Sequence, residues 1–147
     1  MSLEKGYLDK FIKVSELAAY GVSPFIGKGD KNAADKGAVD KMRDELNKIE
    51  MCGTVVIGEG EMDEAPMLYI DEKVGTKKGP EFDIAVDPLE GTNFAAKNLP
   101  GAISVIAISN KNNLFNAPES YMEKISYPKG INHNAIDLDF SLKKNLS

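Results

Sequence analysis

The spacing of apolar residues near the start of the chain predicts a helix. Between Leu8 and Ala19 the apolar side chains recur mostly every three or four residues, which is the repeat of one helix face. Gly21 ends this element, just before Ser23 and Pro24. We therefore expect one amphipathic helix that stops near residue 21.

A second helix is predicted after the loop 27–30. Its apolar face consists of Val39, Met42, Leu46 and Ile49. Asp30 or Asn32 is the expected N-cap, because a short side chain with an oxygen accepts a hydrogen bond from a free backbone N–H of the first turn. We expect Gly53 to end this helix.

Short apolar runs bounded by glycine, proline or asparagine predict strands in the rest of the chain. They occupy residues 54–57, 82–86 and 102–108. A turn at 110–113 leads to a short partner strand near Leu114–Phe115, and the alternation over 120–127 predicts another strand. The segment 66–74 is either a short helix or a strand, and 75–80 is a basic loop.

The last residues, 139–147, predict the first turns of a helix, with Ser141 as its capping residue. Short helices need tertiary packing to persist, and no further turns follow. We therefore expect residues 1–147 to be a domain cut out of a longer protein.

Composition excludes several classes of protein. The chain has 147 residues, enough for one core, with 42% hydrophobic and 28% charged residues, as in an ordinary globular domain. The net charge is −5 and no basic stripe offsets it, so nucleic acid is not an expected partner. No long apolar segment predicts a signal peptide or a membrane span.

The reactive residue types are scarce. Cys52 is the only cysteine, which argues against an internal disulfide and favours a reducing, cytoplasmic setting. His133 is the only histidine and lies in an asparagine-rich loop without an obvious partner. A Ser-His-Asp or Cys-His hydrolase is therefore not expected.

Two carboxylates follow the second apolar strand directly. Pro88 fixes its own φ and biases Asp87 toward an extended conformation, so we expect the strand to break there. That break directs Asp87 and Glu90 toward one point. The alternative is a plain turn with solvated acids.

A second acidic cluster follows the first strand. Glu59, Glu61, Asp63 and Glu64 are crowded within six residues, and they repel one another unless a cation is present. Glycines between these acids allow a tight backbone path, whereas an exposed acidic loop, the other interpretation, does not require one. Oxygen ligands from two strand ends are what Mg²⁺ or Mn²⁺ needs, so the pattern predicts a metal-dependent phosphate-processing site.

Gly91 and Thr92 open a short predicted helix next to these acids. The N–H groups of its first turn and the Thr92 hydroxyl can hold a phosphate oxygen or an attacking water. They can equally serve as an ordinary helix cap. Asp35, early in the second helix, is by itself more typical of a favourable first-turn charge than of a ligand.

These motifs together resemble the class II fructose-1,6-bisphosphatases, within the lithium-sensitive sugar and inositol phosphatase superfamily. The matching segments are residues 29–35, 57–69, 83–92 and 116–124. The combination of Glu-Gly-Glu at 59–61 with Asp-Pro-Leu-Glu-Gly-Thr at 87–92 is highly specific. The resemblance implies a layered α/β sugar-phosphatase fold, in which two N-terminal helices pack on a mixed β-sheet.

The resemblance also implies an activity and a set of site residues. The activity is hydrolysis of the 1-phosphate of fructose 1,6-bisphosphate, a step of gluconeogenesis, with Mn²⁺ or Mg²⁺ as cofactor, by an enzyme that is usually a homo-oligomer. The implied metal ligands are Asp35, Glu59, Asp87 and Glu90. The implied catalytic pair, which orients and deprotonates water, is Asp63 and Thr92. The implied substrate contacts are Glu90, Gly91, Thr92 and Tyr121.

Family members are much longer than this chain, so we expect residues 1–147 to be an N-terminal metal-binding domain whose C-terminal partner is absent. Three functions stay open. The first is the hydrolysis of fructose 1,6-bisphosphate, and the second is the hydrolysis of another phosphate ester, such as sedoheptulose 1,7-bisphosphate or an inositol phosphate. The third is a catalytically silent half-domain that binds metal weakly or serves in assembly.

Overall fold

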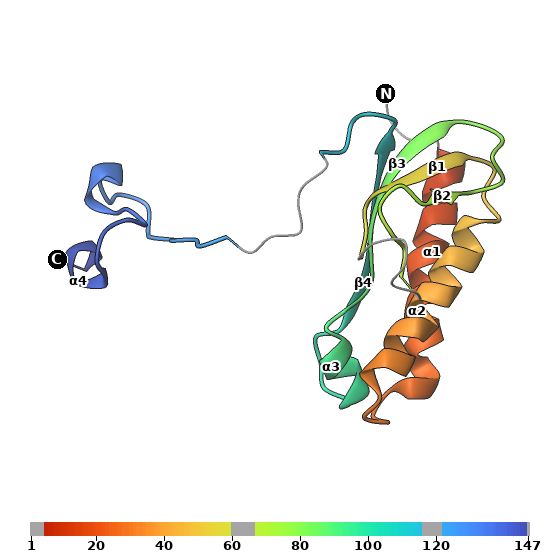
Figure 1. Cartoon of the computed structure of the whole chain (residues 1–147), viewed down its shortest axis with the longest axis horizontal. Helices are drawn as coiled ribbons and strands as arrows, with labels where there is room; N and C mark the ends of the chain where they lie inside the picture. Colours follow the sequence, from red (N-terminus) through yellow and green to blue (C-terminus); the bar gives the residue numbers. More distant parts are fainter. Residues whose placement is uncertain (1–4, 60–66, 116–121, 147) are drawn as a thin grey trace. The chain divides into compact units, whose positions relative to one another are not determined.

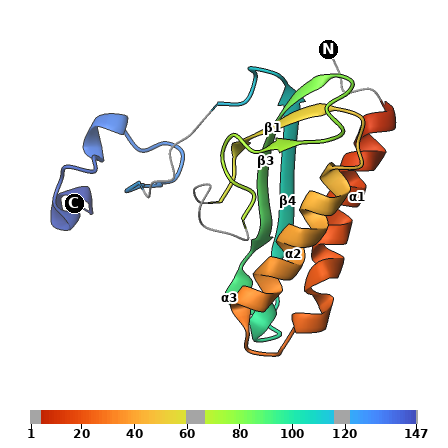
Figure 2. The same cartoon turned by 45° about the vertical axis from the view of Figure 1, so that its right-hand side comes forward.

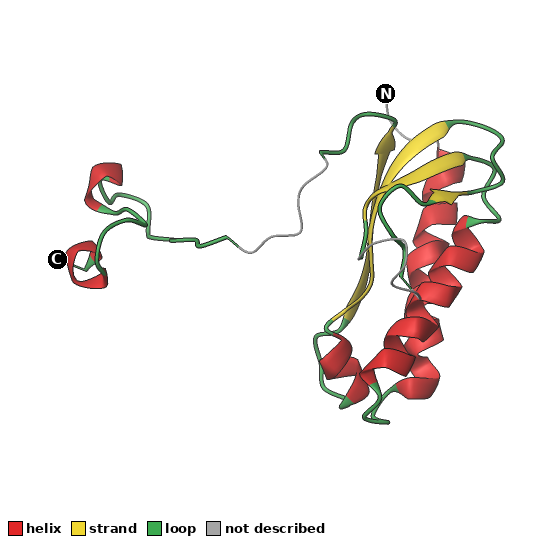
Figure 3. Ribbon diagram, viewed as in Figure 1, coloured by secondary structure: helices red, strands yellow, loops and turns green. Residues whose placement is uncertain are grey.

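The computed structural model describes residues 5–59, 67–115 and 122–146. They belong to two units, residues 1–117 and residues 118–147, and each unit is described by itself. Figure 1 labels the helices and strands, and Figure 3 distinguishes them by colour. Among the helices of the described ranges, none combines the length and the apolar character needed to cross a bilayer.

Two helices open the first unit, as the apolar spacing predicts. Helix α1 is Lys5–Val22, and a 3₁₀ turn, Ser23–Phe25, leads toward α2, Lys31–Leu46. Asp30 caps α2, because its Oδ1 accepts a hydrogen bond of 2.9 Å from the N–H of Ala33. The first of the two predicted caps is therefore the one that the structure uses.

The predicted end of the second helix is wrong. Helix α2 stops at Leu46, and Gly53 instead lies inside strand β1, Cys52–Ile57. A Cβ at Gly53 would lie 2.8 Å from Ile84 Cδ1 and 2.9 Å from Val74 Cγ2. This glycine allows the backbone to approach the core closely, which a local pattern cannot distinguish from a helix stop.

Within the described residues, four strands form one mixed sheet in the order β2-β1-β3-β4. Strand β2 is Lys73–Val74, β3 is Glu81–Glu90 and β4 is Ile103–Asn110. β1 pairs with β3 in parallel, whereas β2 and β4 pair with their neighbours in the antiparallel direction. The α/β fold with two N-terminal helices on a mixed sheet is confirmed.

Helices α1 and α2 cover one face of this sheet (Figure 2). Between the helices and the sheet lie the buried side chains of Val14, Val39, Met42, Leu46, Val55 and Ile84. The rings of Phe11 and Phe82 meet edge to face, with centroids 5.7 Å apart. Because side chains alternate along a strand, Asp83 and Asp87 of β3 lie on the opposite face.

The predicted break of the strand at Pro88 is also corrected. Strand β3 continues to Glu90, and its register with β4 shifts between Asp87 and Glu90. A bulge leaves one extra residue out of the ladder, so a proline without an N–H is tolerated within the strand. The predicted change of direction is therefore a local kink and not an end.

Two predicted strands do not form. Leu114–Phe115 has no strand, and neither does 122–127, while residues 120 and 121 lie outside the described ranges. The undecided segment 66–74 contains a turn followed by β2, and residue 66 also lies outside the description.

The described part of the second unit, residues 122–146, forms two short elements. They are a 3₁₀ turn, His133–Ala135, and helix α4, Leu142–Asn145. Ser141 caps α4, because its Oγ accepts a hydrogen bond of 3.3 Å from the N–H of Lys144. The capping role predicted for Ser141 is confirmed.

Candidate functional site

The C-terminal end of β3 carries the two acids that follow the second apolar run. The bulge leaves Asp87 half-buried and Glu90 exposed at the last position of the strand. The N–H of Leu89 donates a hydrogen bond of 3.1 Å to Asp87 Oδ1. Gly91 follows with φ of 82°, a conformation that favours glycine, and helix α3, Thr92–Ala96, begins there.

Other carboxylates crowd Asp87. Burial, followed by a hydrogen bond with Glu90 and the charge of that group, raises the pKa of Asp87 from 3.8 to about 6. A hydrogen bond with Glu59 and the one from the Leu89 N–H act in the opposite direction and lower it. Glu59 lies two residues after the end of β1 at Ile57, so the structure brings acids from the ends of two parallel, neighbouring strands together.

Asp35 lies in the second turn of α2, whose start is held beside α3. The N–H of Gly27 donates to the Ala95 carbonyl over 3.1 Å, and the N–H of Gly29 donates to the Ala96 carbonyl over 2.8 Å. Asp35 Oδ1 is buried and accepts no hydrogen bond within the described part of the chain. Burial also raises the pKa of this carboxyl group. A buried carboxylate oxygen without a donor adds little to the stability of the fold and is a suitable cation ligand.

The remaining predicted site residues divide into two groups. Gly91 and Thr92 lie at the turn from β3 into α3, directly after Glu90. Asp63 and Tyr121 lie outside the described residues, so the structure places neither of them.

A complete cation site is not formed by the described residues alone. Among residues 5–59, 67–115 and 122–146, no three His, Cys, Asp or Glu side chains are arranged so that they could hold one ion. Two observations nevertheless fit a divalent cation: Asp87 has its pKa raised beside Glu90, and Asp35 Oδ1 lacks a donor. A cation favours the ionised form of every acid near it, so it would remove both costs.

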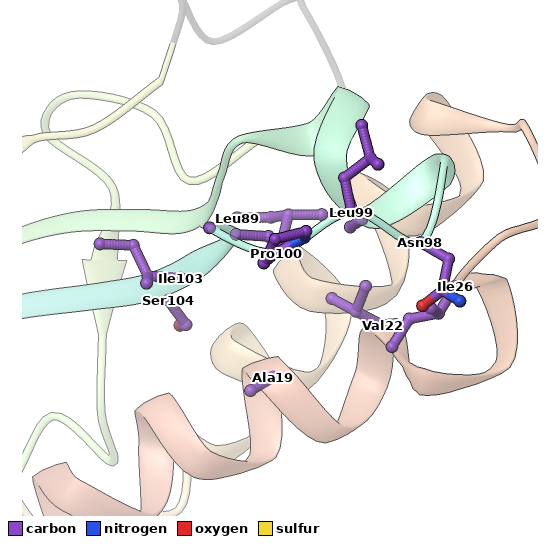
Figure 4. Close-up of a pocket in the computed structure, with 12 residues that line it drawn as sticks. Ala19, Val22, Ile26, Leu89, Asn98, Leu99, Pro100, Ile103 and Ser104 are labelled. Carbon is purple, nitrogen blue, oxygen red and sulfur yellow. The ribbon is translucent and has the colours of Figure 1, made fainter.

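A separate cavity of about 290 Å³ lies near the end of β3, between α1 and the loop before β4 (Figure 4). Leu89 contributes to its wall, and the lining is apolar apart from Asn98 and Ser104. Ser104 Oγ is buried and has no hydrogen-bond partner in the described ranges. Among the described residues that line it none is charged, so this cavity does not offer ligands for a cation or a phosphate.

Two polar groups near the site had no signal in the sequence pattern. Arg43 forms a half-buried ion pair with Glu72, with 2.7 Å between Nε and Oε1. Asp83 accepts hydrogen bonds from backbone groups about 30 residues further along the chain. No local spacing rule relates residues this far apart, although the alternation along β3 places Asp83 on the same face as Asp87.

The fold and the site together define a class of protein. Acidic side chains converge at the ends of parallel strands in an α/β fold, next to a helix start and a carboxylate without a donor. Such an arrangement is typical of a metal-dependent site for phosphate chemistry.

The comparison with protein families identifies the family itself. The family described as "Bacterial fructose-1,6-bisphosphatase, glpX-encoded" matches residues 5–147. The chain therefore belongs to this family, as the sequence motifs predict.

Curated relatives agree with this assignment. The chain is 50% identical over 137 residues to "Fructose-1,6-bisphosphatase 1 class 2" of Escherichia coli (strain K12), covering 93% of this chain and 40% of that protein. It is 48% identical over 149 residues to "D-fructose 1,6-bisphosphatase class 2/sedoheptulose 1,7-bisphosphatase" of Thermosynechococcus vestitus (strain NIES-2133 / IAM M-273 / BP-1), covering 93% and 43%. The chain thus spans about two fifths of the length of these relatives.

Proposed function

We propose that this chain supplies the metal- and water-handling part of a phosphatase that hydrolyses the 1-phosphate of fructose 1,6-bisphosphate. The products are fructose 6-phosphate and phosphate, and the reaction is a step of gluconeogenesis. Family membership supports the reaction class. The single observation that carries the proposal is the meeting of Asp87, at the end of β3, with both Glu59 and Glu90.

The proposed cofactor is Mn²⁺ or Mg²⁺, held by Asp35, Glu59, Asp87 and Glu90. A bound divalent cation neutralises phosphate oxygens and lowers the pKa of a water molecule that it binds. These four residues come from α2, the end of β1 and the end of β3. Three separate elements therefore contribute to the set. Hydrogen bonds from Gly27 and Gly29, just before α2, to Ala95 and Ala96 hold the start of α2 beside α3, the helix that follows β3.

The proposed reaction rests on positioning by the chain's own side chains. Asp63 accepts a proton from the attacking water, and the Thr92 hydroxyl orients that water in line with the leaving sugar oxygen. Glu90, Gly91, Thr92 and Tyr121 contact the substrate. The positive φ of Gly91 turns the chain directly from the last acid of β3 into α3, which places Thr92 beside Glu90.

A second candidate substrate has support of its own. The relative from Thermosynechococcus vestitus is named for both fructose 1,6-bisphosphate and sedoheptulose 1,7-bisphosphate hydrolysis. We therefore keep the seven-carbon bisphosphate as the alternative substrate. Phosphate release measured in parallel from both sugars and from an inositol phosphate separates the three specificities.

The wider setting is proposed from the composition of the chain and, for its assembly, from the resemblance. We expect a cytoplasmic protein that assembles as a homo-oligomer and binds neither nucleic acid nor a membrane. Its partner is a small sugar bisphosphate.

The decisive experiment measures phosphate release from fructose 1,6-bisphosphate during titration with Mn²⁺ and Mg²⁺. It compares this 147-residue chain with a chain of the length of its relatives. Cation-dependent release by the longer chain supports the proposal, and its absence with both cations contradicts it. If only the longer chain is active, residues 1–147 bind the cation but need the further residues for turnover.

A further inference from the structure

Arg43 of α2 makes a forked contact with the segment that follows the acidic cluster. Its Nε donates to Glu72 Oε1 over 2.7 Å, and its Nη2 donates to Glu72 Oε2 over 3.1 Å. The same Nη2 also donates to the backbone carbonyl of Met67. A planar guanidinium can bind a carboxylate through two parallel hydrogen bonds, a bidentate contact that the ammonium group of a lysine cannot make.

The segment held by Arg43 is itself bonded to the end of β1. The N–H of Glu59 donates to the Leu68 carbonyl over 3.0 Å, and the N–H of Asp71 donates to the Val55 carbonyl over 2.8 Å. The N–H of Val55 donates in turn to the Glu72 carbonyl over 3.0 Å. The backbone position of Glu59 therefore depends on residues 67–72, and those residues depend on Arg43.

Glu72 needs this partner because it is almost completely buried. The residue is only 8% exposed, and its Oε2 also accepts a hydrogen bond of 3.3 Å from the N–H of Tyr69. A buried carboxylate that loses its positively charged side-chain partner is left as an uncompensated charge. The segment that carries it must then move so that the carboxylate reaches water. Loss of the Arg43 contact is therefore transmitted to the segment and not confined to one surface pair.

Helix α2 carries both Arg43 and Asp35. The two residues are eight positions apart, which corresponds to about 12 Å along a helix axis. One rigid element thus fixes a predicted cation ligand directly and, through Arg43, the backbone of a second one, Glu59. This arrangement couples the two ligand positions.

We propose that Arg43 is a positioning residue of the metal-dependent site, acting through Glu72 and the Met67 carbonyl to hold Glu59 in register with Asp87. It touches neither the substrate nor the cation. This inference rests on the proposed function, because it assumes that Glu59 and Asp87 bind a divalent cation.

The test measures the Mn²⁺ affinity of this 147-residue chain by electron paramagnetic resonance of the free ion. Arg43→Lys keeps the positive charge and loses the bidentate contact with Glu72. We expect it to weaken Mn²⁺ binding about 10- to 100-fold, as is typical for residues that support metal ligands. Because Arg43 and Glu72 act as one unit, the double variant Arg43→Lys/Glu72→Gln should bind Mn²⁺ no more weakly than the weaker single variant.

The matched control breaks another ion pair of the same helix. Lys13 Nζ lies 2.8 Å from Oε1 of Glu45, a buried acid of α2. Within the described ranges, the hydrogen bonds and ion pairs of Glu45 do not involve residues 67–72. Lys13→Met should leave Mn²⁺ affinity within a factor of two. Hydrogen exchange at the Glu59 amide should accelerate in Arg43→Lys and stay unchanged in Lys13→Met.

The outcomes separate this inference from the proposed function. If the wild-type chain binds no Mn²⁺, the proposed function fails at this site and the inference fails with it. If the wild type binds Mn²⁺ and Arg43→Lys binds it equally well while folded, only the positioning role is overturned. If Arg43→Lys does not fold, Glu72→Gln and the exchange rate of the Glu59 amide give the same decision.

Discussion

Asp83 and Asp87 lie on the same face of one strand, four residues apart, and their surroundings are opposite. Asp83 is 4% exposed, and its Oδ2 accepts hydrogen bonds from the N–H groups of Asn113 at 3.0 Å and Leu114 at 3.3 Å. Asp87 accepts one hydrogen bond from a backbone N–H in the described residues, and burial, together with the hydrogen bond and charge of Glu90, raises its pKa to about 6. Asp83 thus accepts two backbone hydrogen bonds, whereas Asp87 lies against a second acid, Glu90.

The difference separates a structural carboxylate from a candidate ligand. Burial alone raises the free energy of any ionised acid, so it does not distinguish the two. The partners do: Asp83 links the turn after β4 to β3 through two hydrogen bonds, whereas Glu90 increases the cost of a charge on Asp87. A carboxylate kept where its neighbours disfavour it is typical of a functional site.

The largest expected effect comes from Asp87→Asn. The substitution keeps the shape and removes the charge, so we expect Mn²⁺ affinity to collapse and phosphate release by a longer chain to fall at least about 100-fold. The free energy of unfolding without metal should not decrease, because a repulsion is removed. Calorimetric Mn²⁺ titration and urea unfolding check both effects, and full turnover by this variant refutes the assignment of Asp87.

Asp83→Ala should show the reverse pattern. The backbone N–H groups of Asn113 and Leu114 lose their acceptor, and we expect the loss of these two hydrogen bonds to lower the free energy of unfolding by about 1–2 kcal/mol. The Mn²⁺ affinity of the folded protein should stay unchanged. Asp83→Asn is the matched control, because its amide oxygen still accepts from one or both amides and the loss should be smaller. A loss of Mn²⁺ affinity in folded Asp83→Ala would remove the distinction between the two aspartates.

The part of this comparison that was predictable from the sequence is the local part. Apolar periodicity predicts α1 and the start of α2, and a short apolar run before two acids predicts β3 and the position of Asp87. These features depend on residues within one or two turns of each other. The meeting of Glu59 with Asp87 followed from placing both after buried strands.

The part that was not predictable depends on partners far apart in the chain. The donors to Asp83 are 30 and 31 residues away, and Glu72 is 29 residues from Arg43. Likewise, Gly53 looked like a helix stop, because only the packed core shows that Ile84 leaves no room for a Cβ there. Local pattern carries no information about such contacts.

Gly91→Ala tests whether the turn after β3 maintains the site. At φ of 82° a Cβ is strained by about 1–2 kcal/mol, and it would also lie 3.1 Å from Phe94 Cδ2. We expect lower stability and weaker Mn²⁺ binding. Gly29→Ala is the control, since φ is 76° there and no atom lies within 4 Å of the added Cβ. Urea unfolding should show that the strain lowers the free energy of unfolding by a similar amount in both variants. Only Gly91→Ala should change the Mn²⁺ affinity.

The smallest expected effect is the pH dependence of stability without metal. Asp87 binds its proton more tightly in the folded state, since its pKa is about 6 instead of 3.8. The resulting stabilisation is fully present below about pH 4 and is lost as the pH rises through 6. The effect is reduced because Asp87 is only half-buried and solvent screens its charge.

Urea unfolding from pH 4 to pH 8 should therefore show wild type losing stability relative to Asp87→Asn across this range. Saturating Mn²⁺ should reverse that trend, since a bound cation favours the ionised acid. Parallel curves for the two proteins would mean that neither burial nor Glu90 disfavours the charge of Asp87, and its contrast with Asp83 would then rest on geometry alone.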